Sequence, residues 1–561
     1  MRWFSRTDYR SFYLLNATQF LGALNDNLFK LLVVFLLINV IGDQYASSIL
    51  AITGAVFVIP FLLFSSAAGV LADRISKRHI LVSMKGAEVV IMIASMVAVY
   101  FKSPPFCYAL LFIMATQSAI FGPSKYGIIP ELVEQKRVSK ANGTLNSFTY
   151  LAIIAGTFLA SFITEITNRN FLLVSGACVL IAIAGFATSF GITKTPPRGS
   201  KKRINPFFVY EIYQNLIISR KVPHLFQCIL GSAYFLFIGG FAQLNIIPFA
   251  IQSLGLSEVG GGYLFLCTAI GIAIGSVLAG WLCKEHVEPG LSCLAGFALT
   301  ILFFFLMLVS RSLVMVIILL VLLGISGGLF LIPFDSFIQI YSPDKKRGQI
   351  IAASNFLSFI GVLFAAVFLY LVSDVFEYTA ASGFGWMGLL TFLFTLVLTG
   401  RMADLFFPFV VQKVLKKIYR IREDLQKPSG TPVLYLQSRR WREAIYLYAL
   451  YPKLQIVTSG RKGRDFPWFH RFFNNISFIP LDKTKQVPYD KVFEEAKTLH
   501  EQGITVLIFL REEHSKEDLL RSFHEVFQKE VPKINFVEYR KEFFHRWLFP
   551  RKEIFTIFTP H

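Results

Sequence analysis

The chain of 561 residues is 54% hydrophobic and only 16% charged. Soluble domains carry about 25% charged residues, so the composition excludes an ordinary soluble protein and indicates an integral membrane protein. The net charge of +20 does not indicate a nucleic-acid partner, because most basic residues lie in short loops on alternate sides of apolar segments.

Long apolar segments run through the first 410 residues. A membrane-crossing helix needs about 20 apolar residues, and twelve segments reach this length. We expect them at residues 11–41, 46–72, 79–101, 105–130, 139–164, 170–193, 223–252, 258–284, 290–310, 313–340, 347–373 and 380–410. Basic clusters gather at one side of these spans, which places both chain termini in the cytoplasm. The six cysteines form no CxxC pair, so no metal site, disulfide framework or cofactor is expected.

A basic segment, residues 194–222, divides the spans into an N-terminal six-helix half (1–193) and a C-terminal six-helix half (223–410). The halves repeat weakly, because Pro123 and Pro333 stand at the same offset before basic pairs, and Asn146 and Asn355 follow in polar spans. Transporters built from such internal repeats place their substrate site between the repeats, near mid-membrane.

The first span carries charged and amide side chains at its centre: Asn25, Asp26, Asn27 and then Lys30. A charge at bilayer mid-depth costs at least roughly 2.5–3.5 kcal/mol on insertion scales, so such residues usually face a bundle interior or a watery cavity. Asp26 is therefore the first indication of a transport pathway. The i, i+4 spacing of Asp26 and Lys30 also allows a local ion pair, and Asp26 could instead be a proton site.

Between the second and third spans, the run from Gly69 to Arg78 resembles the major facilitator signature G-x-L-A-D-R-x-G-R-R. A glycine allows two helices to approach closely, and Asp73 can accept hydrogen bonds from a helix N-terminus. We therefore predict a conformational gating motif made of Gly69, Asp73, Arg74 and Arg78. The second-half equivalent, residues 280–285, is degraded and receives no gating role.

Two further runs, Thr18–Asn27 and Gly122–Leu132 followed by Lys140–Gly143, resemble the bacterial lysophospholipid transporter family of the major facilitator superfamily. The resemblance covers residues 1–410 and is most specific in the first half. It implies a multi-pass protein of the bacterial cytoplasmic membrane that moves lysophospholipids from the outer to the inner leaflet for reacylation.

The resemblance implies a headgroup site. Asp26 could pair with an ethanolamine ammonium and Lys125 could hold phosphate as a point charge. The other candidate substrate-binding residues are polar neighbours in the same two runs: Gln19, Asn25, Asn27, Lys30 and Tyr126. Lys125 could alternatively snorkel to the membrane interface. The i, i+3 spacing of Lys85 and Glu88 favours a local pair over a substrate contact, while Asp335 could be a gate, a helix cap or an interfacial charge.

Residues 411–561 change in composition and predict a cytosolic α/β domain, with strands at 432–436, 476–481 and 505–510 and a helix at 489–501. The order of these elements resembles the glycerolipid acyltransferase domain. Its catalytic N-H-x-x-x-x-D would fall where this chain has Ser438 and Glu443, and histidine is the general base that the chemistry needs. Since His470 and His514 do not fall at the motif spacing, we predict an inactive relative, which could dock an acylating enzyme.

Together these features predict a transporter and not an enzyme, with a lysophospholipid such as lysophosphatidylethanolamine as substrate and membrane lipids as further partners. The alternative is a proton-coupled major facilitator carrier of another small solute or drug. An active acyltransferase is disfavoured by Ser438 and Glu443.

Overall fold

The structure is a computed structural model that describes residues 9–202, 207–283, 286–309 and 312–415. Beyond them it describes residues 422–423, 433–437, 444–445, 447, 450–451, 454–460, 476–480, 489–510, 526, 534–542 and 552–558. The chain divides into two compact units, Met1–Arg401 and Met402–His561. The expected boundary, after residue 410, lies later than the observed one. The last long helix of the first unit ends at Arg401, and Met402 leaves helical geometry.

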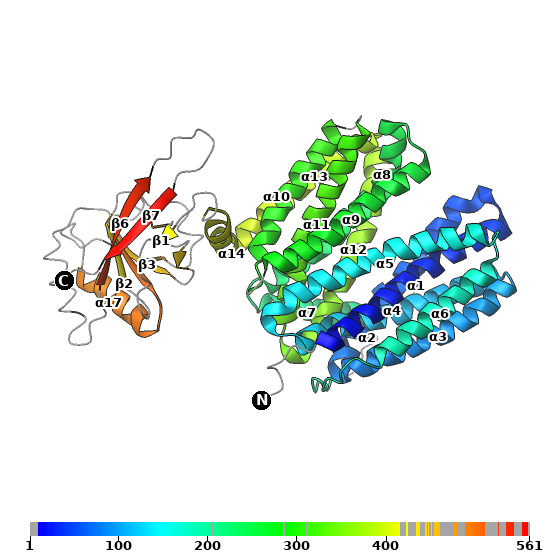
Figure 1. Cartoon of the computed structure of the whole chain (residues 1–561), viewed down its shortest axis with the longest axis horizontal. Helices are drawn as coiled ribbons and strands as arrows, with labels where there is room; N and C mark the ends of the chain where they lie inside the picture. The colour runs from blue at the N-terminus through cyan, green and yellow to red at the C-terminus, as the bar shows by residue number, and fades with distance from the viewer. Residues whose placement is uncertain are drawn as a thin grey trace. The chain divides into compact units, whose positions relative to one another are not determined.

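Twelve helices among the described residues are long and apolar enough to cross a membrane, as the sequence predicts. The first half of the unit contains α1 (Tyr9–Ile41), α2 (Ala46–Arg74), α3 (Lys77–Tyr100), α4 (Pro104–Leu132), α5 (Val138–Ile166) and α6 (Phe171–Ser189). The second half contains α8 (Leu225–Leu254), α9 (Glu258–Leu282), α10 (Pro289–Leu308), α11 (Leu313–Tyr341), α12 (Arg347–Tyr370) and α13 (Ala380–Arg401). Figure 1 shows α1–α6, in blue and cyan, gathered beside the green and yellow helices α8–α13.

Local sequence signals explain where several helices begin. Pro104 and Pro289 stand in the first turns of α4 and α10, where a missing backbone N–H costs nothing. The Asn170 side chain accepts a hydrogen bond from the Leu173 backbone nitrogen at 3.3 Å and so caps α6. Prolines within the spans, such as Pro123 and Pro333, are tolerated because neighbouring helices support the interrupted backbone.

The basic segment between the halves contains one short helix that the sequence analysis did not foresee, α7 (Phe208–Arg220). It packs against α2, α12 and α8. We call the end of the bundle where this segment lies the linker end, and the other the distal end. The α2–α3, α4–α5 and α11–α12 turns also lie at the linker end, since each of these helices crosses the bundle once.

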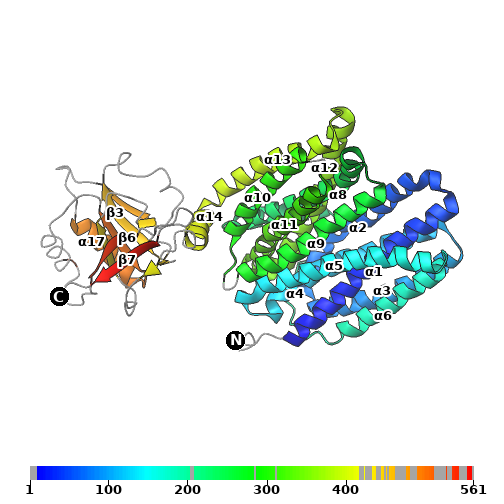
Figure 2. The ribbon, with the colours of Figure 1, turned by 45° about the horizontal axis from the view of Figure 1, so that its top comes forward.

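The two halves meet along pairs of helices: α2 packs on α12, α5 packs on α9 and α11, and α4 packs on α11 and α12 (Figure 2). Within the first half, α1 is buried along most of its length and forms the centre of the core with Leu28, Leu32 and Leu36. Large apolar residues such as Val90 and Leu180 face outward, as expected for helices surrounded by acyl chains.

The second unit begins with α14 (Ala403–Phe409) and contains a seven-stranded sheet with the strand order β1-β7-β6-β2-β5-β3-β4. The strands are β1 (Arg422–Glu423), β2 (Val433–Gln437), β3 (Gln455–Gly460), β4 (Ile476–Pro480), β5 (Val506–Leu510), β6 (Ile534–Glu542) and β7 (Lys552–Phe558). Strands β2 to β6 pair in parallel, and β7 runs antiparallel to β6. Helix α17 (Tyr489–Glu501) packs Val492, Phe493 and Ala496 on this sheet.

The predicted strands correspond to β2, β4 and β5, and the predicted helix is α17, so the expectation of an α/β domain is confirmed for the described residues. The positions on which the catalytic comparison rests lie outside the described residues. These are Ser438, Glu443, His470 and His514.

Candidate functional site

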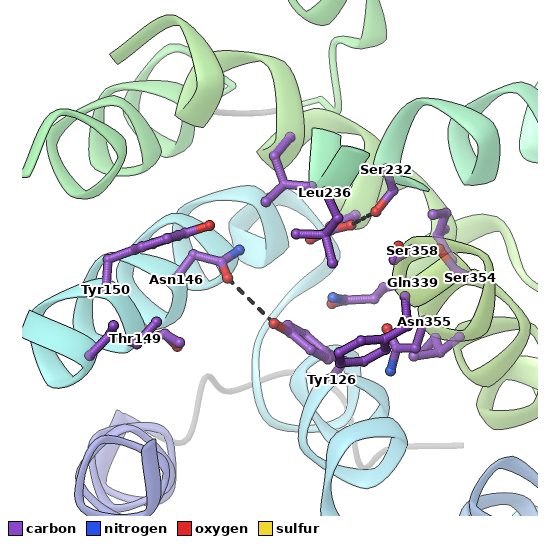
Figure 3. Close-up of a pocket in the computed structure, with 16 residues that line it drawn as sticks. Tyr126, Asn146, Thr149, Tyr150, Ser232, Leu236, Gln339, Ser354, Asn355 and Ser358 are labelled. Atoms are coloured by element: carbon purple, nitrogen blue, oxygen red, sulfur yellow. Dashed lines mark hydrogen bonds between the residues drawn. The ribbon is translucent and has the colours of Figure 1, made fainter. Parts of the chain in front are cut away.

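A cavity of about 170 Å³ lies between the two halves (Figure 3). Helices α4 and α5 supply one side, and α8, α11 and α12 supply the other. Its lining is mixed polar and apolar: Tyr126, Asn146, Thr149, Tyr150, Ile153, Ser232, Leu236, Leu331, Asp335, Ile338, Gln339, Ile351, Ser354, Asn355, Ser358 and Phe359. Its position at the interface of the two repeats agrees with the expectation from the internal duplication.

Asp335 supplies the carboxylate of this cavity. The Ser232 hydroxyl donates a hydrogen bond to Asp335 Oδ1 at 2.8 Å. Across the cavity, the Tyr126 hydroxyl donates to Asn146 Oδ1 at 3.4 Å (Figure 3). The Asn146 side chain interacts with the Asp335 carboxylate, although its Nδ2 forms no hydrogen bond of normal length in the part of the chain that the structure describes. The cavity wall therefore offers a carboxylate that lies beside a hydroxyl and an amide.

Lys125 lies beside the cavity, next to the lining residue Tyr126. Its ammonium nitrogen is 4.5 Å from the centroid of the Tyr126 ring, a cation–π contact. It interacts electrostatically with Asp26 and Asp335, although no carboxylate of the described residues is close enough to form an ion pair with it. Lys125 is thus a half-buried cation that interacts with two carboxylates and forms an ion pair with neither.

Asp26 lies within the first half and does not line this cavity. The Ser118 hydroxyl donates to Asp26 Oδ2 at 2.8 Å, while the buried Oδ1 has no hydrogen-bond partner among the described residues. Lys30 is directed to the Phe57 ring, with 5.3 Å between its nitrogen and the ring centroid. The local Asp26–Lys30 ion pair that the helix spacing allowed is absent from the described residues.

A second buried group of charges lies next to Asp26. Lys85 Nζ is 2.5 Å from Glu88 Oε2, and both side chains are almost completely buried, which confirms the local pair predicted from their spacing. Asn25 Nδ2 donates to Glu88 Oε1 at 2.8 Å. A side chain at Gly22 would meet the Lys85 nitrogen at 2.2 Å, so this glycine leaves room for the lysine to cross α1.

The remaining candidate residues of the first span form hydrogen bonds inside the first half. Gln19 donates to the Leu145 carbonyl at 3.2 Å and accepts from the Thr149 hydroxyl at 2.9 Å, which joins α1 to α5. Asn27 donates to the Ala23 carbonyl one turn earlier, at 2.8 Å. Of the predicted substrate-binding residues, Tyr126 therefore lines the cavity and Lys125 adjoins it. Gln19, Asn25, Asp26, Asn27 and Lys30 lie within the helix bundle.

The predicted gating motif lies at a close contact between the halves at the linker end. A side chain at Gly69 would meet the Gln349 Cα at 2.8 Å and the Gly348 carbonyl oxygen at 2.9 Å. Asp73 accepts hydrogen bonds from the backbone nitrogens of Gly348 (2.7 Å) and Gln349 (3.1 Å) and from the Gln349 side chain (3.1 Å). The carboxylate thereby occupies the N-terminus of α12, where the helix dipole favours an anion.

The two arginines of the motif differ from each other. Arg74 is exposed. Arg78 donates to the carbonyls of Phe190 (2.9 Å) and Ile192 (2.7 Å) and so caps the C-terminal end of α6. It therefore joins two parts of the first half.

A second inter-half contact, between α5 and the α9–α11 pair, was not predicted. Asn142 donates to Ser336 and Gln339, both at 3.1 Å. A side chain at Gly143 would meet the Ser276 carbonyl oxygen at 2.3 Å, and one at Gly280 would meet the Lys140 Cα at 2.9 Å. The degraded second repeat thus retains a glycine at a close helix crossing. The Lys140–Gly143 run was the available signal, since Asn and Gly in adjacent span positions often mark helix contacts.

Ion pairs at the same end join the linker to both halves. Glu131 pairs with Lys77 at 2.8 Å and with Arg198 of the linker at 2.9 Å. Arg198 also lies 3.9 Å from Asp344 of the second half, which pairs with Arg347 at 2.7 Å. With the two helix contacts, this network closes the linker end of the bundle.

A family model described as the Major Facilitator Superfamily matches residues 17–366. The lysophospholipid transporter LplT of Enterobacter sp. (strain 638) is 25% identical over 328 residues, which cover 58% of this chain and 78% of that protein. The lysophospholipid transporter LplT of Escherichia fergusonii is 26% identical over 349 residues, which cover 60% of this chain and 82% of that protein.

Solved structures share the helical fold at low sequence identity. The human organic anion transporter MFSD10 superposes with a TM-score of 0.60 at 14% identity, over 70% of this chain and 100% of that chain. The fucose:proton symporter FucP of Escherichia coli superposes with a TM-score of 0.58 at 15% identity, over 71% of this chain and 99% of that chain. At these identities the likeness describes the fold alone.

Proposed function

The chain belongs to the major facilitator superfamily, and from that premise we propose that it moves lysophospholipids from the outer to the inner leaflet of a bacterial cytoplasmic membrane, where reacylation follows. The linker end, which carries the basic loops, is the cytoplasmic end in this proposal, and both termini are cytoplasmic.

One observation carries the proposal: Asp335 lines the inter-half cavity, Lys125 with the opposite charge adjoins it, and no ion pair joins them in the described residues. A zwitterionic headgroup such as phosphoethanolamine carries the complementary pair of charges. Phosphate would bind Lys125, and the ammonium would bind Asp335. The two lysophospholipid transporters LplT, which are 25% and 26% identical to this chain, support the same substrate class.

The size of the cavity also favours a headgroup. Sites that enclose a whole drug-sized molecule measure about 300–1,000 Å³, whereas this cavity measures about 170 Å³. A phosphoethanolamine group would fill it, and the single acyl chain would remain along apolar helix faces. Leu236, Leu331 and Phe359 give the cavity an apolar flank for the start of that chain.

Transport in this family requires the two halves to rock about the bound substrate. The Asp73 contact and the Glu131 network hold the linker end closed, so a lipid would enter from the distal end, in the outer leaflet. Separation of α2 from α12 and of α5 from α9 would then release the headgroup to the inner leaflet.

The test is uptake of labelled lysophosphatidylethanolamine into spheroplasts that lack other lysolipid flippases. Lys125→Ala and Asp335→Asn should each reduce uptake at least about tenfold at equal expression, because loss of one charge-assisted contact costs roughly 1.5–3 kcal/mol. Lys201→Ala, which removes an exposed lysine of the linker, is the matched control and should transport normally. Undiminished uptake in both cavity variants would refute the proposed headgroup site.

The second candidate function is proton-coupled transport of another small solute. The observation that favours it is the buried group of Asp26, Lys85 and Glu88 in the first half, where one Asp26 oxygen has no partner among the described residues. A protonophore separates the two functions. Uptake by an uncoupled lipid facilitator should continue after its addition, whereas a proton-driven carrier should stop.

For the second unit, we propose an acyltransferase-like domain without acyltransferase activity. The chain order of β2, β4 and β5 supports the resemblance, but serine and glutamate stand at the positions of the catalytic histidine and aspartate. Purified full-length protein incubated with lysophosphatidylethanolamine and an acyl donor should form no diacyl product. Sustained turnover would overturn this assignment.

A further inference from the structure

A second cavity lies on the other side of α8 from the inter-half cavity. It is a groove of about 740 Å³ between the end of α7, the start of α8 and the end of α13. Its lining residues are Arg220, Val222, Pro223, His224, Phe226, Gln227, Leu230, Phe394, Val397, Leu398 and Arg401. None of these lines the inter-half cavity, to which α8 contributes Ser232 and Leu236.

The groove has one basic end. Arg220 is the last residue of α7, and Arg401 is the last residue of α13. The Arg220 guanidinium stacks on Phe226, 4.6 Å from the ring centroid, which holds it at the mouth of the groove. No carboxylate is among the described lining residues, and neither arginine forms an ion pair within the described part of the chain. Two uncompensated arginines therefore face the same opening.

Apart from His224 and Gln227, the rest of the groove is apolar, and it faces the surroundings of the bundle. Val397 is 65% exposed and Leu230 is 37% exposed, although both belong to membrane-crossing helices. Deeper along the groove, the Tyr234 and Phe394 rings stack at 3.8 Å and close the space between α8 and α13. Helix geometry places this stack about 10 Å from Arg401 along α13, because each residue of a helix rises about 1.5 Å.

Helix α7 indicates the depth in the membrane at which the basic end of the groove lies. Tyr210 and Tyr213 are exposed on this helix, and exposed tyrosines beside a span are typical of the headgroup layer of a membrane. Arg220 ends the same helix, and α8 begins its span five residues later, at Leu225. The arginines thus lie at headgroup level and the apolar groove extends from them into the acyl-chain layer.

We propose that this groove binds an anionic phospholipid of the leaflet at the linker end. Arg220 and Arg401 hold its phosphate, and an acyl chain lies along the wall formed by Leu230 and Val397. Arginine suits this task because its planar fork binds phosphate oxygens in pairs. The lipid joins the end of α7 to α8 and α13, so it stabilises the second half without occupying the transport cavity.

The test is thermal unfolding of the purified full-length protein in neutral detergent, with dioleoylphosphatidylglycerol, dioleoylphosphatidylcholine or inorganic phosphate added. Only phosphatidylglycerol should raise Tm, by several degrees, because a ligand that binds the folded state alone stabilises it. Arg220→Gln/Arg401→Gln should lose most of this shift. Lys140→Gln/Lys194→Gln removes the same charge from two exposed lysines at the linker end and should keep it.

A second variant tests the apolar wall of the groove without changing the charge of the groove. Val397→Trp fills the apolar wall and leaves both arginines in place, so it too should lose the shift. Native mass spectrometry gives a direct measurement, in which the arginine variant should retain at least about tenfold less phosphatidylglycerol than the lysine control. Equal retention in these two variants would overturn the proposal. A full shift in Val397→Trp, or an equal shift with phosphatidylcholine or with inorganic phosphate, would do so as well.

Discussion

Replacing Asp73 with asparagine should release the linker end of the bundle. The carboxylate accepts hydrogen bonds from Gly348 and from two donors of Gln349, across the α2–α12 contact. Hydrogen bonds to a charged group contribute roughly 1.5–3 kcal/mol each, and an anion at a helix N-terminus contributes about 0.3–1 kcal/mol more. Asparagine keeps one acceptor oxygen but turns an NH₂ group toward the Gln349 donors, so the closed arrangement should lose roughly 3 kcal/mol.

These bonds exist only while α2 and α12 touch, so the whole loss falls on the closed arrangement. Since about 1.4 kcal/mol changes an equilibrium tenfold, Asp73→Asn should shift the balance between closed and open linker ends about 100-fold. The shift can be measured by electron paramagnetic resonance between spin labels at Ile75→Cys and Tyr341→Cys, both exposed at the linker end. Cys267→Ser provides the background, because the other five cysteines are buried.

In the parent protein the two labels should give one short distance, and Asp73→Asn should add a longer one as the main population. Arg74→Ala is the matched control, since Arg74 is the exposed neighbour of the aspartate, and it should leave the distribution unchanged. An unchanged distribution in Asp73→Asn would show that the carboxylate does not hold the halves together.

Two further predictions concern packing within the bundle. Lys85→Met alone should lower Tm strongly in detergent, because it leaves Glu88 buried without its partner, at a cost of about 3–5 kcal/mol. The double variant Lys85→Met/Glu88→Leu should recover most of the loss, and failure to recover would contradict the pairing. Gly143→Val should separate α5 from α9, because its Cβ would lie 2.3 Å from the Ser276 carbonyl oxygen, and should open the linker end in the same spin-label assay. Gly54→Val meets nothing within 4 Å and should have no effect; equal behaviour of the two variants would refute the steric argument.

The spans and their division into two halves could be predicted because hydropathy and loop charge act locally along the chain. The end of the last span could not, since residues 402–410 are as apolar as a span although α13 ends at Arg401. Helix α7 was missed because its 13 residues are too few for a span and follow a basic, proline-containing segment. Its contacts with α2 and α12 supply the support that so short a helix needs.

The candidate site was predicted only in part. Tyr126 and Lys125 were found through a motif, and they lie at the cavity. Gln19, Asn25 and Asn27 instead form hydrogen bonds within the first half. Helix α1 is apolar, and its buried residues are spread around the helix. Its sequence therefore does not indicate which way its polar side chains point.

Contacts between halves depend on residues far apart in the sequence. The sequence allowed three roles for Asp335. Only the fold shows that it lies beside Ser232 and lines the same cavity as Tyr126. The Asn142 and Gly143 contacts with α9 and α11 likewise join positions more than 130 residues apart. No local pattern encodes such pairs.

The most direct measurement is transport by the purified full-length protein alone, reconstituted into liposomes with fluorescent lysophosphatidylethanolamine in the outer leaflet. The account predicts that the protein carries the lipid to the inner leaflet, where an added membrane-impermeant quencher cannot reach it, and that Lys125→Ala remains at the rate of protein-free liposomes. Protection of the lipid at the same rate with and without the protein would contradict it.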